Sequence, residues 1–232
     1  MMKIIRSADR HYSDHGWLKS CWLFSFADYF DPDNVRFGAL RVFNDDIVAP
    51  QSGFPPHPHR EMEIITVVLE GAITHEDSMG NRTVVAAGDV QRMSAGTGVT
   101  HSEFNRADQP VHLYQIWMIP GAARLPPSYA QQHFESGQWR NRLLPVASGQ
   151  GLADAVSFHT DATISRAELD AGRNIDFAGG PGRAVFIYTG HGRLSVNGEE
   201  IAQNDQLRIH PDGPLHMTAQ ENTGFILIDT HV

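Results

Sequence analysis

Two pairs of candidate metal ligands occur in this sequence, and the residues of each pair are two positions apart. One pair is His57 and His59 in "HPH", and the other is His101 and Glu103 in "HSE". Residues i and i+2 of a β-strand point to the same face, so each pair can present both side chains to one side of a sheet. Three neutral imidazoles and one carboxylate suit a borderline divalent metal. We therefore predict that these four residues hold one ion and leave coordination positions open.

Other residues compete for the role of ligand. A single His-x-His pair is a weak signal, because the chain contains 13 histidines among 232 residues. Glu63 follows His59 by four positions and begins an apolar run, so we interpret it as a hydrogen-bonded supporting carboxylate. His112 lies in an apolar strand and is predicted to be a core histidine with its hydrogen bonds satisfied. His75 adjoins the turn "EDSMGN" and is predicted to be exposed.

The segments that position these residues are predicted to be short strands separated by turns. Apolar and β-branched runs alternate with glycine-containing turns between residues 63 and 94, a spacing typical of an all-β sandwich or barrel. The segment "ALRVFNDDIVAP" is predicted to be a strand that ends in a turn at Asn-Asp-Asp. The polar segment "SYAQQHFESGQWRNRL" is compatible with partly helical structure, and we interpret it as a connection between two domains.

A weak internal repeat supports two tandem copies of one β unit. In each copy a strand ends at a glycine, a hairpin follows, and an Asp-led strand precedes a glycine-rich turn and a histidine, His101 or His216. The predicted domains are residues 1–130 and residues 131–232. In the second copy Asp176 and Ala178 stand near the positions of His57 and His59. Because one imidazole does not hold a metal, we expect the second domain to be metal-free and structural.

Composition limits the classes of partner and compartment. The chain has 27 acidic and 18 basic residues and a formal charge of −9, which argues against direct nucleic-acid binding. Its single cysteine, Cys21, excludes an intrachain disulfide and fits a reducing compartment. The first residues lack a signal-peptide core, and no apolar run has the length of a membrane span. We expect a cytoplasmic protein without a membrane partner.

These motifs also carry a family resemblance. The segments "HGWLKS", "FSFADYFDP", "LRVFNDD", "HPHREMEIITVVLEG", "HEDSMGN", "AGDVQRMSAGTGVTHSE" and "LYQIWMIP" resemble the pirin family, in particular its bacterial branch with quercetinase activity. The resemblance covers most of residues 12–120. Beyond about residue 140 it depends on length, the β pattern and the ending "LIDTHV". One departure is that Trp22 and Leu23 precede "FSFA", where many relatives have histidine and threonine.

The resemblance implies an all-β bicupin, with two tandem cupin-type β-barrels of the jelly-roll or double-stranded β-helix type and a short, partly helical connection. It places one metal in the N-terminal barrel, held by His57, His59, His101 and Glu103. Iron is the first expectation, and nickel, copper, manganese, zinc and cobalt are alternatives. The family's glutamate after His-x-His, here Glu63, is not a ligand.

The implied activity is that of a metal-dependent dioxygenase, which opens a flavonol such as quercetin with O2 and releases carbon monoxide. Glu103 would act as the base that accepts the proton of the flavonol 3-hydroxyl. An apolar pocket is expected; the nearby apolar residues Phe54, Met62, Met93 and Phe104 are individually more typical of a core. One alternative is a non-enzymatic regulatory or redox-sensing protein that acts through a protein partner. Another is a different metal-dependent cupin enzyme, such as an isomerase, with quercetin turnover as a side activity. We expect a monomer.

Overall fold

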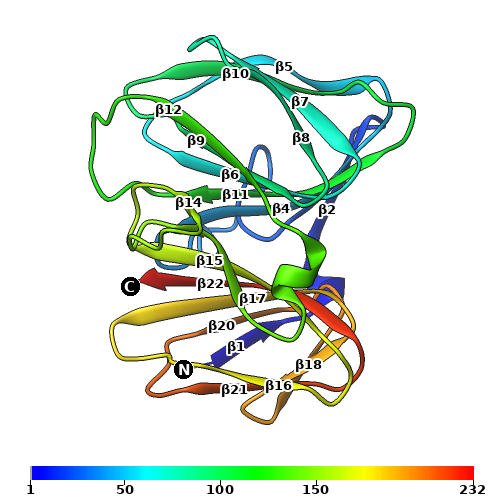
Figure 1. Cartoon of the computed structure of the whole chain (residues 1–232), viewed down its shortest axis with the longest axis vertical. Helices are drawn as coiled ribbons and strands as arrows, with labels where there is room; N and C mark the ends of the chain where they lie inside the picture. Colours follow the sequence, from blue (N-terminus) through cyan, green and yellow to red (C-terminus); the bar gives the residue numbers. More distant parts are fainter. Residues whose placement is uncertain (1) are drawn as a thin grey trace. The chain divides into compact units, whose positions relative to one another are not determined.

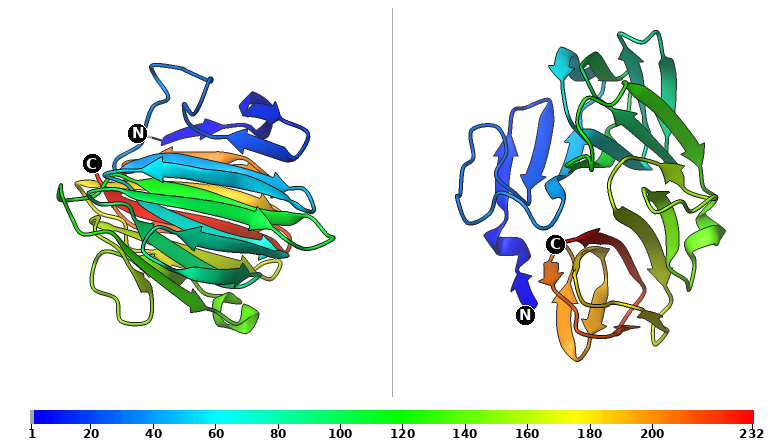
Figure 2. Two further views of the ribbon diagram at one scale, coloured as in Figure 1. Left: turned by 90° about the horizontal axis from the view of Figure 1, so that it is seen from above. Right: turned by 90° about the vertical axis from the view of Figure 1, so that its left-hand side faces the viewer.

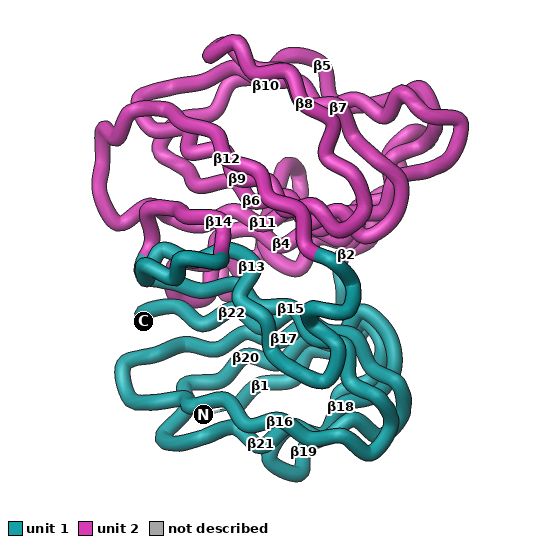
Figure 3. The backbone as a smooth tube through the Cα atoms, viewed as in Figure 1, with its two compact units in different colours: residues 1–10, 135–154, 161–232 teal, residues 11–134, 155–160 magenta. Residues whose placement is uncertain are grey.

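The structure, a computed structural model, describes residues 2–232 and divides into two compact units. Unit 1 contains the described residues up to Arg10 together with 135–154 and 161–232, and unit 2 contains 11–134 and 155–160 (Figure 3). The change of unit after residue 134 lies close to the predicted boundary at residue 130. The described residues up to Arg10 belong to unit 1, although the predicted ranges group them with the first domain, which corresponds to unit 2. Residues 155–160 belong to unit 2, although the predicted ranges group them with the second domain.

Unit 2 is built from two antiparallel sheets, which Figure 1 shows as separate layers. The seven-stranded sheet has the order β12-β9-β6-β11-β4-β3-β2. Its strands are β2 (His11–Asp14), β3 (Leu18–Trp22), β4 (Leu40–Val48), β6 (Glu63–Glu70), β9 (Asp89–Ser94), β11 (Val111–Met118) and β12 (Ser128–His133). The four-stranded sheet has the order β5-β10-β7-β8, with β5 (Ser52–His59), β7 (Ala72–Asp77), β8 (Arg82–Ala86) and β10 (Val99–Asn105). The short strand β14 (Val156–Ser157) belongs to the same unit.

Apolar side chains between the sheets form the core of unit 2. One cluster includes Val68, Ile73, Val85 and Val111, each fully buried. Their β-branched side chains favour extended backbone and pack well on a pleated surface. This core holds the two sheets in place around the polar residues described below.

Unit 1 repeats the two-sheet arrangement. One sheet contains the run β1-β20-β17-β22-β15-β13, and the other has the order β16-β21-β18-β19. The elements are β1 (Met2–Ile5), η1 (Ser7–Asp9), η2 (Ser136–Trp139), β13 (Leu144–Ser148), β15 (Ala162–Leu169), β16 (Asn174–Phe177), β17 (Arg183–His191), β18 (Arg193–Val196), β19 (Glu199–Ala202), β20 (Gln206–Ile209), β21 (Leu215–Ala219) and β22 (Thr223–His231). The N-terminal strand β1 lies beside β20, with Met2 opposite Ile209 (Figure 2). This pairing explains why the start of the chain belongs to unit 1.

Two local expectations need correction. The predicted turn at Asn44, Asp45 and Asp46 is wrong, because β4 continues through all three residues to Val48. β4 pairs with β11 on one side and β3 on the other, and this two-sided ladder overrides the turn preference of Asn and Asp. The predicted connection is partly strand, since β12 runs over its first residues, and the 3-10 helix η2 supplies its helical part.

The helical elements of residues 2–232 are η1 and η2, of three and four residues. No helix in this described part of the chain has the length and apolar character needed to cross a membrane.

Candidate functional site

Strands β5 and β10 bring three of the predicted ligands together. His57 lies directly opposite His101 in the ladder, and His59 lies opposite Val99. β5 is an edge strand, so the prolines before and between its histidines remove no hydrogen bonds from a second neighbour. One ring nitrogen of each of the three histidines lies within 4.8 Å of the others. The cluster depends on the pairing of β5 with β10, and the role of the three histidines as metal ligands stays a prediction.

Close approach of these strands depends on Gly53. A Cβ atom at this position would lie 2.2 Å from the carbonyl oxygen of Glu103 and 2.6 Å from the Cα of Phe104. Neither backbone atom can move away without displacing β10. The β5–β10 ladder also shifts register between His101 and Glu103, where β5 has one extra residue between His57 and Phe54, whereas β10 pairs with β7 without a shift. Gly53 and this bulge together set the positions of the ligands from β5 and β10.

The ring nitrogens are prepared to bind a cation. Nε2 of His101 is buried and has no hydrogen-bond partner among residues 2–232. Nδ1 of His57 lies 2.8 Å from the carbonyl oxygen of Pro55, so the ring donates Nδ1–H there and keeps its Nε2 lone pair. Burial, then the neighbouring His101, lowers the pKa of His59 to about 4. Burial, then the neighbouring His57, lowers the pKa of His101 to about 3. Because a metal binds the neutral imidazole, this donor set fits a divalent transition metal.

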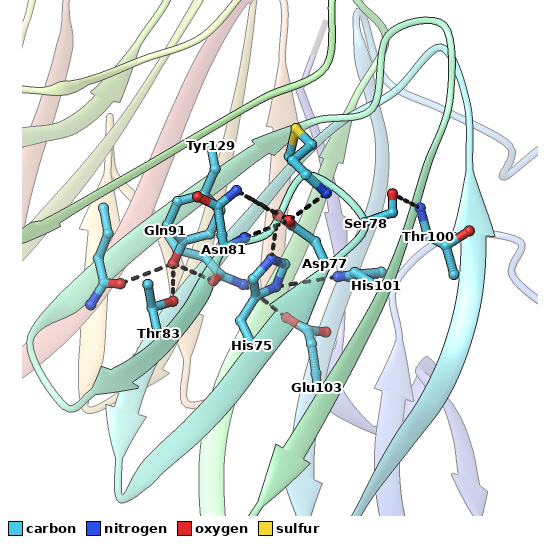
Figure 4. Close-up of polar contacts among 12 residues, drawn as sticks. His75, Asp77, Ser78, Asn81, Thr83, Gln91, Thr100, His101, Glu103 and Tyr129 are labelled. Carbon is cyan, nitrogen blue, oxygen red and sulfur yellow. Dashed lines mark hydrogen bonds and ion pairs between the residues drawn. The ribbon is translucent and has the colours of Figure 1, made fainter.

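His75 supports this cluster from the adjacent strand β7 (Figure 4). The prediction that His75 is exposed is wrong, because its exposed fraction is 0%. Its Nδ1 lies 3.4 Å from Nδ1 of His101, and its Nε2 lies 3.0 Å from Oδ2 of Asp77. When His101 presents Nε2 to a cation, its Nδ1 carries the ring proton, and Nδ1–H donates a hydrogen bond to Nδ1 of His75. His75 then donates Nε2–H to Asp77, a carboxylate–histidine–histidine chain that orients the ligand.

Glu103 lies beside His75 and His101, held by two glutamines. Its Oε1 accepts a hydrogen bond of 2.8 Å from Nε2 of Gln91, and its Oε2 accepts one of 3.0 Å from Nε2 of Gln115. Ligand atoms of His75, His101 and Glu103 form a second group within 4.8 Å, which shares His101 with the three-histidine group (Figure 4). His75 uses one ring nitrogen for His101 and the other for Asp77, whereas Nε2 of His101 has no partner in the described part of the chain, which favours the three-histidine group.

Glu63 has the surroundings that its sequence position indicates, and His112 has them only in part. Glu63 is buried and accepts hydrogen bonds from Ser94 Oγ at 2.7 Å and His159 Nδ1 at 3.2 Å, so it is a hydrogen-bonded carboxylate. His112 is only partly buried, and its Nε2 lies 2.6 Å from Oδ1 of Asp45. Burial lowers the pKa of His112, but the Asp45 carboxylate outweighs it and gives a net rise. His112 therefore has its predicted hydrogen bond but lies nearer the surface than a core residue.

A cavity of about 360 Å³ opens beside the three histidines. The volume lies at the lower end of the range for small-molecule sites, about 300–1,000 Å³. Both sheets of unit 2 contribute to its wall. The lining residues are His15, Trp17, Leu18, Ser20, Trp22, Phe26, Ala27, Asn44, Asp46, Phe54, His57, His59, Ile64, His101, Glu103, Gln115 and Trp117. Eight of these residues are apolar, four are histidines and five carry other polar side chains.

Of the apolar residues near the predicted ligands, some line the cavity and others belong to the core. Phe54 lines the cavity, whereas Met93 is fully buried in a core cluster against which Met62 packs. The ring of Phe104 lies under Arg106, whose guanidinium carbon is 5.4 Å from the ring centre. Trp22, one of the two residues that depart from the family pattern, lies in the cavity wall.

Unit 1 contains a strand pairing that corresponds to the β5–β10 ladder of unit 2. His216 lies opposite Asp176 in the pairing of β21 with β16, as His101 lies opposite His57 in unit 2. The His216 Nδ1 atom is 2.8 Å from Asp176 Oδ1, and both side chains are exposed. The strand pairing agrees with the internal repeat seen in the sequence.

Comparison with known proteins covers both units. The Pirin family model matches residues 5–118, and a model for the quercetinase C-terminal cupin domain matches residues 145–230. A pirin-like protein of Caulobacter vibrioides is 43% identical over 218 residues, or 94% of each chain. A quercetin 2,3-dioxygenase of Escherichia coli K12 is 37% identical over 230 residues, or 99% of this chain and 98% of its own. The crystal structure of the bacterial pirin YhhW from Escherichia coli in complex with nickel(II) matches with a TM-score of 0.94 and 36% identity, covering 100% of this chain and 99% of that chain. These matches confirm the predicted fold of two tandem cupin domains.

Proposed function

Because the chain belongs to the pirin family, we propose that it is a metal-dependent dioxygenase that opens a flavonol such as quercetin with O2 and releases carbon monoxide. The observation that carries the proposal is the group of three histidines beside an aromatic-lined cavity that also contains Glu103. A quercetin dioxygenase name among its relatives supports the choice of substrate class.

In this proposal His57, His59 and His101 hold the metal, with Glu103 as the fourth ligand or as its immediate neighbour. Iron is the first candidate, and the nickel complex of YhhW supports a divalent first-row ion more generally. When bound, such an ion supplies Lewis acidity, which favours ionisation of a substrate hydroxyl group. Metal analysis of protein isolated without added metal tests the identity of the ion.

Glu103 takes the proton of the flavonol 3-hydroxyl. An ionised carboxylate has about four acceptor sites; the hydrogen bonds from Gln91 and Gln115 occupy two of them, and Thr66 Oγ1 is a more distant donor at 3.5 Å from Oε1. The remaining sites can accept a substrate proton. Since both glutamine amides are donors to Glu103, they also prevent the carboxylate from rotating away from the cavity.

The cavity wall orients the flat substrate and limits access of water. Trp17 and Phe54 meet edge to face with ring centres 4.9 Å apart, and Phe26 meets Trp117 in the same way at 5.4 Å. Aromatic faces of this kind favour contact with a planar ring system. The deprotonated flavonol is electron-rich and is the species that reacts with O2.

The test is turnover of quercetin by metal-loaded protein, followed as quercetin loss, O2 uptake and carbon monoxide release. His57→Ala should lose metal and activity together. Glu103→Gln should lower kcat by about 10²–10⁴-fold, the usual contribution of a general base. His216→Ala is the matched control, because it removes the corresponding histidine of unit 1 and should leave turnover unchanged. A metal-replete wild-type protein that neither consumes quercetin nor releases carbon monoxide would refute the proposal.

A further inference from the structure

A strip of buried polar side chains lies in the cavity wall on strands β3 and β4. Ser20, Asn44 and Asp46 all line the cavity, and their exposed fractions are 1%, 3% and 3%. Ser20 lies directly opposite Asp46 in the ladder, and Asn44 is two residues before Asp46 on the same face. These strands belong to the seven-stranded sheet, whereas the three histidines come from the four-stranded sheet. A molecule in the cavity therefore meets the histidines and this polar strip on walls from different sheets.

Besides His101, two residues of this cavity wall carry a buried polar atom without a partner among the described residues. Oδ1 of Asn44 and Nε1 of Trp117 are buried and accept or donate no hydrogen bond within the described residues. Buried polar groups in folded proteins are nearly always paired, because desolvation without a hydrogen bond is unfavourable. One unpaired acceptor and one unpaired donor on residues of the same cavity wall match a ligand that carries both a hydroxyl group and an acceptor oxygen.

The carboxyl group of Asp46 can donate a hydrogen bond when it is protonated and accept one when it is ionised. Ser20 Oγ donates a short hydrogen bond to its Oδ1. Burial raises the pKa of Asp46 to about 7, opposed by the Ser20 hydrogen bond and reinforced by the charges of Asp45 and Glu103. Near neutral pH this carboxyl group is therefore present in both protonation states, which suits the binding of a weakly acidic phenol.

We propose that Ser20, Asn44 and Asp46 form a second recognition site, which binds a phenolic hydroxyl other than the one delivered to Glu103. The substrate class is then a planar aromatic with hydroxyl groups on more than one ring. In this site Asn44 Oδ1 accepts a hydrogen bond from the phenol. The Asp46 carboxyl group donates a hydrogen bond to the phenol or accepts one from it, and Trp117 Nε1 donates a hydrogen bond to an oxygen of the ring system. This inference rests on the proposed function for its choice of flavonol probes.

Binding of two probes that differ only in ring hydroxyls tests the site. Metal-loaded protein is titrated calorimetrically under nitrogen, so that binding is measured without turnover, with quercetin and with 3-hydroxyflavone, which lacks the additional hydroxyls. The wild-type protein should bind quercetin about tenfold more tightly, as expected when a buried hydrogen-bonding group is left unpaired by the simpler ligand. Asn44→Leu and Asp46→Leu should each reduce this ratio towards one while 3-hydroxyflavone binds as before.

Asp45→Leu is the matched control. Asp45 lies between the two strip residues on the same strand, and its carboxylate pairs with His112 instead of lining the cavity. It should leave the ratio unchanged. If Asp46→Leu fails to fold by circular dichroism, Asn44→Leu decides the question. A wild-type ratio near one, or a ratio that Asn44→Leu leaves intact, overturns the inference.

The same titrations separate this inference from the proposed dioxygenase function. Selective quercetin binding that is lost in Asn44→Leu supports the site even if the wild-type protein releases no carbon monoxide. Carbon monoxide release together with equal binding of the two probes refutes the site and leaves the dioxygenase function standing.

Discussion

Replacing His75 by phenylalanine should weaken metal binding without unfolding the protein. Phenylalanine keeps an aromatic ring where His75 stacks on Tyr129, with ring centres 4.8 Å apart. Asp77 also keeps its hydrogen bonds from the backbone N–H of Met79 at 2.9 Å and the side chain of Asn81. The principal loss is the acceptor for Nδ1–H of His101.

The magnitude follows from the geometry of that contact. The Nδ1–Nδ1 distance of 3.4 Å is long for a hydrogen bond, so its net value lies near 1 kcal/mol, or about fivefold in affinity. Loss of a residue that orients a metal-bound histidine usually costs about 10–100-fold. The long contact points to the lower end of this range, and we expect the dissociation constant for the metal to be about tenfold larger in His75→Phe.

The measurement is a competitive titration of metal between the protein and a chromophoric chelator, with urea unfolding as a check on stability. His75→Gln should recover part of the affinity, because a glutamine oxygen can accept from His101. His112→Phe is the control, since it removes another carboxylate-paired histidine of unit 2 that does not line the cavity. If folded His75→Phe binds metal within twofold of the wild-type protein, the orienting role of His75 is wrong.

Three further changes test other parts of the site. Gly53→Ala should lower the free energy of unfolding by about 1–3 kcal/mol and weaken metal binding, because its Cβ would meet the Glu103 carbonyl at 2.2 Å; unfolding and chelator titrations check this, and unchanged values would contradict it. Asp46→Asn should become more stable relative to the wild-type protein as pH rises. The pKa of Asp46 is about 7 in the folded protein, against an ordinary value of 3.8. Between pH 3.8 and pH 7 the folded state therefore keeps a proton that the unfolded state has lost, and the stability of the wild-type protein falls as pH rises through this interval. Urea unfolding at pH 4 and pH 8 should show a relative gain of about 3–4 kcal/mol, and a constant difference would argue against the raised pKa. Gln115→Leu should lower kcat for quercetin about tenfold with metal content unchanged, because Glu103 loses a charge-assisted hydrogen bond; steady-state kinetics beside metal analysis tests it, and an unaltered kcat would count against the role of this glutamine.

The strand period made part of the site predictable. Side chains two residues apart share a face of any extended strand, so the pairs His57–His59 and His101–Glu103 could be recognised from spacing alone. The hydrogen-bonded character of Glu63 followed from its position at the start of an apolar strand. These are local properties, and local geometry does not depend on which strands become neighbours.

The misreadings arose where strand pairing overrides local preference. The polar turn after His75 suggested exposure, but β7 lies between β10 and β8, and this position buries the ring next to His101. The run of Asn44, Asp45 and Asp46 suggested a turn. As part of a central strand it instead directs Asn44 and Asp46 into the cavity and Asp45 towards His112.

The β period, the candidate ligands and the duplicated unit could be recognised without a structure, because each depends on the spacing of residues along the chain. Which histidines form one cluster became clear from the folded arrangement of the strands, as did the lack of a partner for Nε2 of His101 among the described residues. The folded arrangement also decided that Gln91 and Gln115 hold Glu103, and that Asp46 faces the same cavity. The physical reason is that these relations join strands far apart in the chain. Their register follows from packing of the whole core, which spacing along one strand does not specify.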